Sequence, residues 1–164
     1  MKQKTMKIKT TKLILAILIC QSAGIVGSIF TSPSIQTWYT TLQKPSFTPP
    51  NWLFAPVWLT LFFLMGISLY LVWNKGLKNK RVKNSLYLFG LQLILNAVWS
   101  LLFFGLRSPF LGLIEIVFLW VFILLTILKF YKISRTAAWL LVPYIVWVSV
   151  ALMLNFSIWW LNPI

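Results

Sequence analysis

The chain has 164 residues, of which 60% are apolar, and its 15 Lys and Arg residues face one acid, Glu115. Soluble domains of this size carry roughly 25% charged residues, whereas this chain carries 10% and has a mean hydropathy of +0.86. Long apolar runs with few charges are typical of membrane-spanning helices. The composition therefore excludes an ordinary soluble domain and predicts an all-α integral membrane protein.

The residue inventory also excludes several kinds of chemistry. The chain has no His, so His-based catalysis, His-containing zinc sites and His-ligated haem are not available. A single Cys cannot form an intrachain disulfide, and a single carboxylate cannot form an acid/base pair. The basic residues lie in short blocks between apolar runs, which does not favour nucleic-acid binding. We expect no metal site and no required cofactor. The abundant side chains are aromatic, with 10 Trp, 13 Phe and five Tyr.

Five apolar runs are long enough to cross a bilayer. Each contains 18 to 25 residues, and a helix rises ~1.5 Å per residue against a hydrocarbon core of ~30 Å. The runs predict a single five-helix membrane domain over residues 1–164, with a long loop over residues 31–51 that is rich in Pro and aromatic residues. The predicted spans are 13–30, 52–73, 86–106, 110–128 and 137–161.

The connections between spans differ strongly in charge. Thirteen Lys and Arg residues fall on one side of the predicted topology, and only Lys44 and Arg107 fall on the other. Basic loops stay in the cytoplasm, so we expect a cytoplasmic N-terminus, an outer loop 31–51 and a C-terminus outside. This bias fits a bacterial cytoplasmic membrane. The basic residues on the inner side are Lys2, Lys4, Lys7, Lys9, Lys12, Lys75, Lys78, Lys80, Arg81, Lys83, Lys129, Lys132 and Arg135.

An alternative interpretation makes residues 1–24 a cleaved signal peptide. The basic arm, the apolar stretch 13–20 and the small residues Ser22 and Gly24 fit that pattern. However, apolar residues continue through Ile25, Val26 and Phe30, which favours a retained first helix.

Polar and aromatic residues fall at one depth in different spans. Counting from the outer ends at ~1.5 Å per residue places four of them ~7–11 Å below the outer boundary. Such groups are costly to expose to lipid and should turn inward. This predicts a pocket that opens outward beneath the stiff loop. The four residues are Trp58, Trp99, Glu115 and Asn155.

Structural roles remain open for several of these residues. Asn96 lies one turn deeper on the face of Trp99, and both Asn96 and Asn155 are also typical of hydrogen bonds between helices. Trp residues at helix ends are usually interfacial anchors. Glu115 is either a functional acid or a carboxyl hydrogen-bonded to a neighbouring helix, and we favour the second interpretation.

The sequence WYTTLQKPSFTPPNW at residues 38–52 carries a resemblance to a known family. It is followed in order by residues 56–58, 96–99, 103–105 and 140–144, and then by Trp147, Ala151, Leu154 and Asn155. Together these segments resemble the tryptophan-rich sensory protein / translocator protein (TspO) family over about residues 13–161. The chain departs from the family pattern at Phe47, where a Trp is usual.

The resemblance implies a five-helix fold, a homodimer, and a pocket covered by the first long loop. Members of that family bind porphyrins, sterols and benzodiazepine-type ligands, and some bacterial members promote the light-dependent breakdown of protoporphyrin IX. Two pocket tryptophans are required for that reaction, and they match Trp58 and Trp147 by position. The family's drug-site lining matches Ala151 and Leu154.

We therefore expect a membrane receptor for a flat apolar ligand, with a metal-free porphyrin as the ligand and the lipid bilayer as its surroundings. Light-dependent oxidation would depend on Trp58 and Trp147. The alternatives are a transporter of porphyrins or other apolar anions and a ligand-responsive regulatory scaffold. Lys44 is expected to meet the ligand's carboxylates. The predicted ligand-binding residues are Trp38, Tyr39, Trp58, Asn96, Trp99, Phe103, Trp147, Ala151, Leu154 and Asn155.

Overall fold

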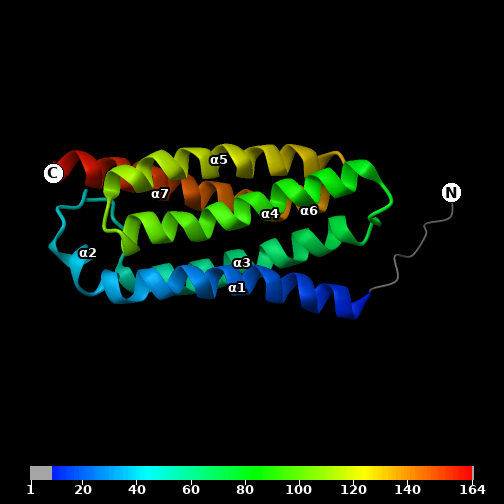
Figure 1. Cartoon of the computed structure of the whole chain (residues 1–164), viewed down its shortest axis with the longest axis horizontal. Coiled ribbons are helices and arrows are strands. Elements are labelled where there is room, and N and C mark those ends of the chain that lie inside the picture. Colours follow the sequence, from blue (N-terminus) through cyan, green and yellow to red (C-terminus); the bar gives the residue numbers. More distant parts are fainter. Residues whose placement is uncertain (1–8, 164) are drawn as a thin grey trace.

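The structure is a computed structural model that describes residues 9–163, and over that range it is helical with no strand (Figure 1). Five of its segments are long and apolar enough to cross a membrane, as the sequence predicts: α1, α3, α4 with η1, α5, and α6 with α7. The elements are α1 (Thr10–Ile35), α2 (Trp38–Thr41), α3 (Asn51–Trp73), α4 (Lys80–Ser100), the π-helical turn η1 (Leu101–Gly105), α5 (Pro109–Tyr131), α6 (Arg135–Leu140) and α7 (Val142–Leu161).

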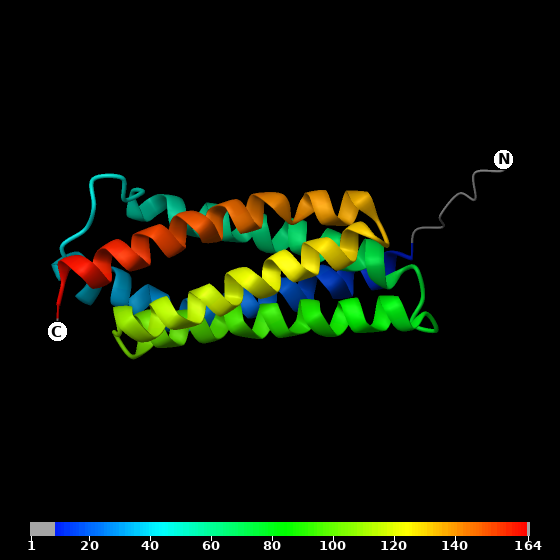
Figure 2. The ribbon, with the colours of Figure 1, turned by 90° about the horizontal axis from the view of Figure 1, so that it is seen from above.

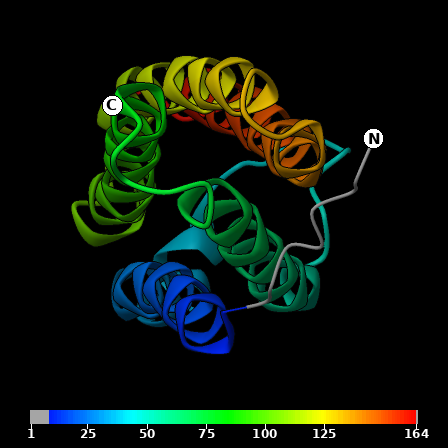
Figure 3. The ribbon, with the colours of Figure 1, turned by 90° about the vertical axis from the view of Figure 1, so that its right-hand side faces the viewer.

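The long helices form an elongated bundle that is a ring in end view (Figures 2 and 3). Helix α1 packs against α3 on one side and α4 on the other, and α5 packs against α4 and α7. The ring closes where α3 contacts α6, and there the Ser68 hydroxyl donates to the Ala137 carbonyl at 2.7 Å. The order around the ring is therefore α1, α3, α6–α7, α5 and α4.

Three of the helices begin at a side chain that accepts a hydrogen bond from the first turn. Asn79 accepts from the backbone N–H of Arg81 at 2.9 Å. Ser108 and Ser134 cap α5 and α6 in the same way, each at 3.3 Å. These caps satisfy backbone donors that have no partner inside the helix, so short connections can separate α4, α5 and α6 from the preceding elements.

The third and fifth spans are less regular than the sequence predicts. The fifth span is divided at Leu141 into α6 and α7, because Pro143 cannot donate to the preceding turn and its ring crowds the chain. The third span ends in η1, where the Leu106 N–H donates to the Leu101 carbonyl at 2.7 Å. A π-helical turn shifts the helix register, and here the adjacent Phe103 and Phe104 are both buried.

The first span and the loop after it also differ from prediction. Helix α1 begins before and ends after the predicted span of 13–30, so part of the predicted loop 31–51 is helical. The one-turn helix α2 occupies a further part of that loop. Ala16 and Cys20 of α1 are fully buried in the bundle, which favours a retained helix over a signal peptide.

The charged connections lie at opposite ends of the bundle. The α3–α4 and α5–α6 connections lie at the end where α1 begins (Figure 1), and together with the adjoining helix ends they hold most of the described Lys and Arg residues. Lys44 and Arg107 lie at the end that carries α2. The bundle thus separates charge as predicted, while its orientation in the membrane stays a prediction. Lys2, Lys4 and Lys7 lie outside the described residues.

Small residues allow α1 and α3 to pack closely. A Cβ added at Gly66 of α3 would lie 2.7 Å from the Cα of Ile17 in α1, too close for any real contact. Gly90 of α4 has nothing within 4 Å of such a Cβ. The absence of a side chain at Gly66 therefore sets the distance between the two helices.

We predict that Gly66→Ala lowers the stability of the purified protein by about 1–3 kcal/mol, because the backbone of α1 must move away. Gly90→Ala is the matched control and should leave stability unchanged or slightly raise it, because Ala favours helix. Thermal unfolding in detergent measures both variants. Equal midpoints for the two would contradict this packing.

Candidate ligand-binding site

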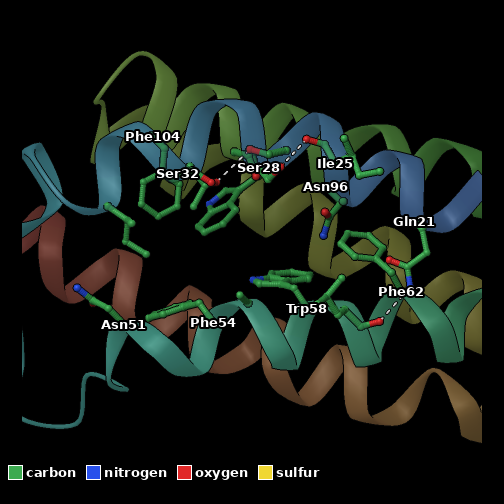
Figure 4. Close-up of a pocket in the computed structure, with 18 residues that line it drawn as sticks. Gln21, Ile25, Ser28, Ser32, Asn51, Phe54, Trp58, Phe62, Asn96 and Phe104 are labelled. Carbon is green, nitrogen blue, oxygen red and sulfur yellow. Dashed lines mark hydrogen bonds between the residues drawn. The ribbon is translucent and has the colours of Figure 1, made fainter.

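A cavity of about 340 Å³ lies between α1, α3 and α4, in the half of the bundle that carries α2 (Figure 4). Phe54 and Trp58 of α3 point into it from one side, and Ser28 and Ser32 of α1 lie on the other side together with Phe104 (Figure 4). The lining residues are Gln21, Gly24, Ile25, Gly27, Ser28, Thr31, Ser32, Ile35, Asn51, Phe54, Ala55, Trp58, Leu59, Phe62, Asn96, Trp99, Ser100 and Phe104.

Two tryptophans form the broad walls of this cavity. The Trp58 indole stacks on Phe62 with ring centroids 5.5 Å apart and planes 28° apart. The Trp99 indole stacks on Phe103 at 5.4 Å and 21°. Each stacked partner fixes the orientation of its indole, so the cavity has two flat and rigid aromatic surfaces.

The polar group at the centre of the cavity is anchored to the opposite side of the bundle. Asn96 of α4 donates to the Tyr144 hydroxyl of α7 at 3.0 Å, and that hydroxyl donates to Gln92 at 3.0 Å. All three residues are buried. The network holds the Asn96 amide in place and leaves its carbonyl oxygen as a hydrogen-bond acceptor beside Trp58 (Figure 4).

Trp147 lies outside this cavity, in the seam between α3 and α7. It contacts Phe54 edge-to-face at 6.0 Å, and Trp58 contacts Tyr144 in a similar way at 6.2 Å. These aromatic pairs fill the space between α3 and α7. Trp147 is therefore separated from the cavity by Phe54, which itself lines it.

The short helix α2 covers the end of the bundle with aromatic rings. Trp38 contacts Phe103 at 5.6 Å, and Tyr39 contacts Phe104 at 5.7 Å. Burial raises the pKa of Tyr39 to about 12, so its phenol is neutral at physiological pH. Lys44 donates to the carbonyls of Tyr39 and Leu42 at 2.7 and 3.2 Å. Lys44 thus stabilises α2, and its expected contact with the ligand's carboxylates stays a prediction.

Asn155, Ala151 and Leu154 of α7 also lie outside the cavity lining. Asn155 accepts a hydrogen bond from the Trp99 indole N–H at 3.1 Å and donates to the Pro109 carbonyl at 2.7 Å. It therefore joins α4, α5 and α7, which is the interhelical role left open above. Leu154 is buried in the core and Ala151 packs against it.

Glu115 is buried in α5, yet neither carboxyl oxygen has a hydrogen-bond partner among residues 9–163. The expected hydrogen bond to a neighbouring helix is thus not formed in the described part of the chain. Glu115 does not line the cavity either.

The predicted site residues therefore divide into two groups. Trp58, Asn96 and Trp99 meet at the cavity. Trp38, Tyr39, Phe103, Trp147, Ala151, Leu154 and Asn155 surround it as a second layer or fill neighbouring seams.

The α1 side of the cavity is not among the residues predicted from the sequence. Small and polar residues lie there at helical spacing: Gln21, Gly24, Ser28 and Ser32. Steps of three and four residues place them on one face of a helix. That spacing is the feature of the sequence that indicates a cavity-facing side of α1. It is hard to recognise because the span is otherwise strongly apolar.

The arrangement suits a flat, largely apolar molecule. Such a ligand can stack on the two indoles and bury its faces against Phe62, Phe104 and Ile35, while Asn96 and Ser100 offer a few polar contacts. The described residues thus define a multi-pass membrane protein with five spanning helices and an aromatic cavity in one half of its bundle.

Comparison with known proteins identifies the family. The model of the TspO/MBR family matches residues 16–161. A tryptophan-rich protein TspO of Chlorobaculum tepidum is 50% identical over 92% of this chain and 96% of its own length. Protein CrtK of Rhodobacter capsulatus is 40% identical over 88% of each chain, and the human translocator protein is 39% identical over 82% of this chain and 80% of its own. The chain belongs to the TspO/MBR family, which confirms the resemblance, while the expected homodimer stays a prediction.

We predict that Asn155→Leu destabilises the protein by about 1–3 kcal/mol, because the Trp99 indole N–H and the Pro109 carbonyl lose their buried partner. Ser157→Ala is the control, since its hydroxyl bonds only the Met153 carbonyl in its own helix, and its effect should stay within about 0.5 kcal/mol. Thermal unfolding in detergent separates the two. If Asn155→Leu lowered the stability no more than the control does, the interhelical role of Asn155 would be contradicted.

Proposed function

We propose that this protein is a membrane receptor of the TspO type that binds a metal-free porphyrin between α1, α3 and α4 and promotes its light-dependent oxidation. The observation that carries the proposal is the pair of indoles, Trp58 and Trp99, that line one cavity on rigid aromatic supports. The sensory role is supported by relatives, among them the tryptophan-rich sensory protein of Cereibacter sphaeroides, which is 32% identical over 76% of this chain.

The size of the cavity is compatible with a tetrapyrrole that is only partly enclosed. Its volume of about 340 Å³ is at the lower end of the range of ~300–1,000 Å³ for small-molecule sites. A porphyrin macrocycle would fill the cavity and extend beyond its mouth, where Ile25, Ser28 and Asn51 are exposed. The apolar ring system would be inside and the propionates at the rim.

No acid/base pair is required for the proposed oxidation. A photoexcited porphyrin takes one electron from an adjacent indole, which leaves an indole radical cation and a porphyrin radical anion. The radical anion passes its electron to dioxygen, which becomes superoxide. The indole radical cation then takes an electron from the porphyrin, so that the indole is restored. The resulting porphyrin radical cation combines with superoxide, which adds both oxygen atoms to the macrocycle. Trp58 is suited to be the direct donor because it lines the cavity, whereas Trp147 would act through Phe54 and Trp58. Both tryptophans would thus contribute to the oxidation, Trp58 directly and Trp147 indirectly.

We predict that Trp58→Phe slows the light-dependent loss of protoporphyrin IX absorbance by at least about tenfold, which corresponds to ~1.4 kcal/mol. Phe keeps an aromatic surface but is a much poorer electron donor. Trp147→Phe should slow the reaction less, because Trp58 remains. Purified protein in detergent is illuminated with protoporphyrin IX in air, and the absorbance is followed with time.

The control is Trp160→Phe, because Trp160 is 70% exposed at the end of α7 and does not line the cavity. It should degrade the porphyrin at the wild-type rate. A wild-type rate in Trp58→Phe would refute its role as donor. If protoporphyrin IX did not quench the Trp fluorescence of the wild-type protein in the dark, binding itself would be refuted.

A further inference from the structure

A second cavity, of about 360 Å³, lies between the start of α4 and the α5–α6 connection. The helix ends that line it lie at the end of the bundle opposite α2 (Figure 1), and it shares no lining residue with the aromatic cavity. Its lining contains three cationic side chains from two separate elements, Arg81 of α4 with Lys129 and Lys132 of the α5 end. The remaining lining residues are Asn84, Ser85 and Ile133.

No carboxylate neutralises this cluster. The single acid of the chain, Glu115, is 14 residues before Lys129 on the same helix, a distance of ~21 Å along the axis. The neighbouring cations Lys83 and Arg135 lie over aromatic rings instead, at 5.9 Å from Tyr87 and 5.5 Å from Tyr131. Within residues 9–163, Arg81, Lys129 and Lys132 thus surround the cavity with no protein counter-charge.

The inner side of the cavity is rigid. Ser85 is buried in its lining, and its hydroxyl donates to the Arg81 carbonyl at 2.8 Å. One turn further along α4, Phe89 stacks on Phe130 of α5 with ring centroids 5.6 Å apart and planes 7° apart. This pair fixes α4 against α5, so the helix ends that carry the three exposed cations are held around a preformed space.

The surface beside the cations is apolar. Leu125 and Leu128 are exposed, and each lies four residues before one of the two lysines, so α5 continues the cationic face as an apolar stripe. A phosphate alone would use only the cations. A phospholipid would place its phosphate among them and its acyl chains along the stripe.

We propose that this cavity binds the phosphate of an anionic phospholipid at the end of the bundle where α1 begins. Basic pockets between membrane helices are suited to such headgroups, and the lysine stems can lie along apolar surface while their charged ends reach the interface. The site is separate from the aromatic cavity and does not depend on the proposed porphyrin chemistry.

The test measures the thermal unfolding midpoint of purified protein in detergent as phosphatidylglycerol, phosphatidylcholine or inorganic phosphate is added. Phosphatidylglycerol should raise the wild-type midpoint more than the other two. In the triple variant Arg81→Gln, Lys129→Gln, Lys132→Gln, the phosphatidylglycerol concentration needed for half the effect should rise at least about tenfold.

The control variant Lys75→Gln, Lys78→Gln, Lys83→Gln removes the same charge from outside the cavity lining and should respond like the wild type. Circular dichroism checks that both variants fold. If the triple cavity variant does not fold, the single variant Lys132→Gln replaces it in the titration. Equal losses in the cavity and control variants would overturn the site. A response to inorganic phosphate as large as that to phosphatidylglycerol would overturn the lipid assignment.

Discussion

Polar side chains inside a hydrocarbon slab must find partners within the protein, because no water is available to them. In this bundle Asn155 meets that requirement for three helices together. It accepts from the Trp99 indole of α4 and donates to the Pro109 carbonyl at the start of α5. A second network joins Asn96 and Gln92 of α4 to Tyr144 of α7. These hydrogen bonds hold α4, α5 and α7 together as the most strongly connected part of the fold.

Helix α1 lies outside both networks, and the aromatic cavity opens where it meets the rest of the bundle. It is held by close packing at Gly66 and by single hydrogen bonds, such as that from Ser34 to the Phe104 carbonyl at 2.8 Å. The tryptophan that Asn155 fixes in place is also a wall of the cavity. Ligand binding thus depends on a wall of α4 that both networks hold in place, and on α1 and α3, which lie outside the networks and pack closely against each other.

The number of spans and most of their limits could be predicted from apolar run length, and the inward position of Trp58, Asn96 and Trp99 from the cost of exposing polar groups to lipid. The break at Leu141 and the π-helical turn were missed because local backbone geometry leaves little trace in composition. Trp147 was placed with Trp58 through family resemblance, which gives no information on which seam of the ring a side chain enters. The structure assigns it to the α3–α7 seam.

The central claim is that the ligand occupies the cavity between α1, α3 and α4, and protoporphyrin IX titration of two matched variants tests it most directly. Ser28 lines the cavity on α1, whereas the next residue, Ile29, is 62% exposed and does not line it. Fluorescence titration should show binding at least about tenfold weaker in Ser28→Phe, because the ring fills the cavity, and unchanged in Ile29→Phe. Wild-type affinity in Ser28→Phe would contradict the account.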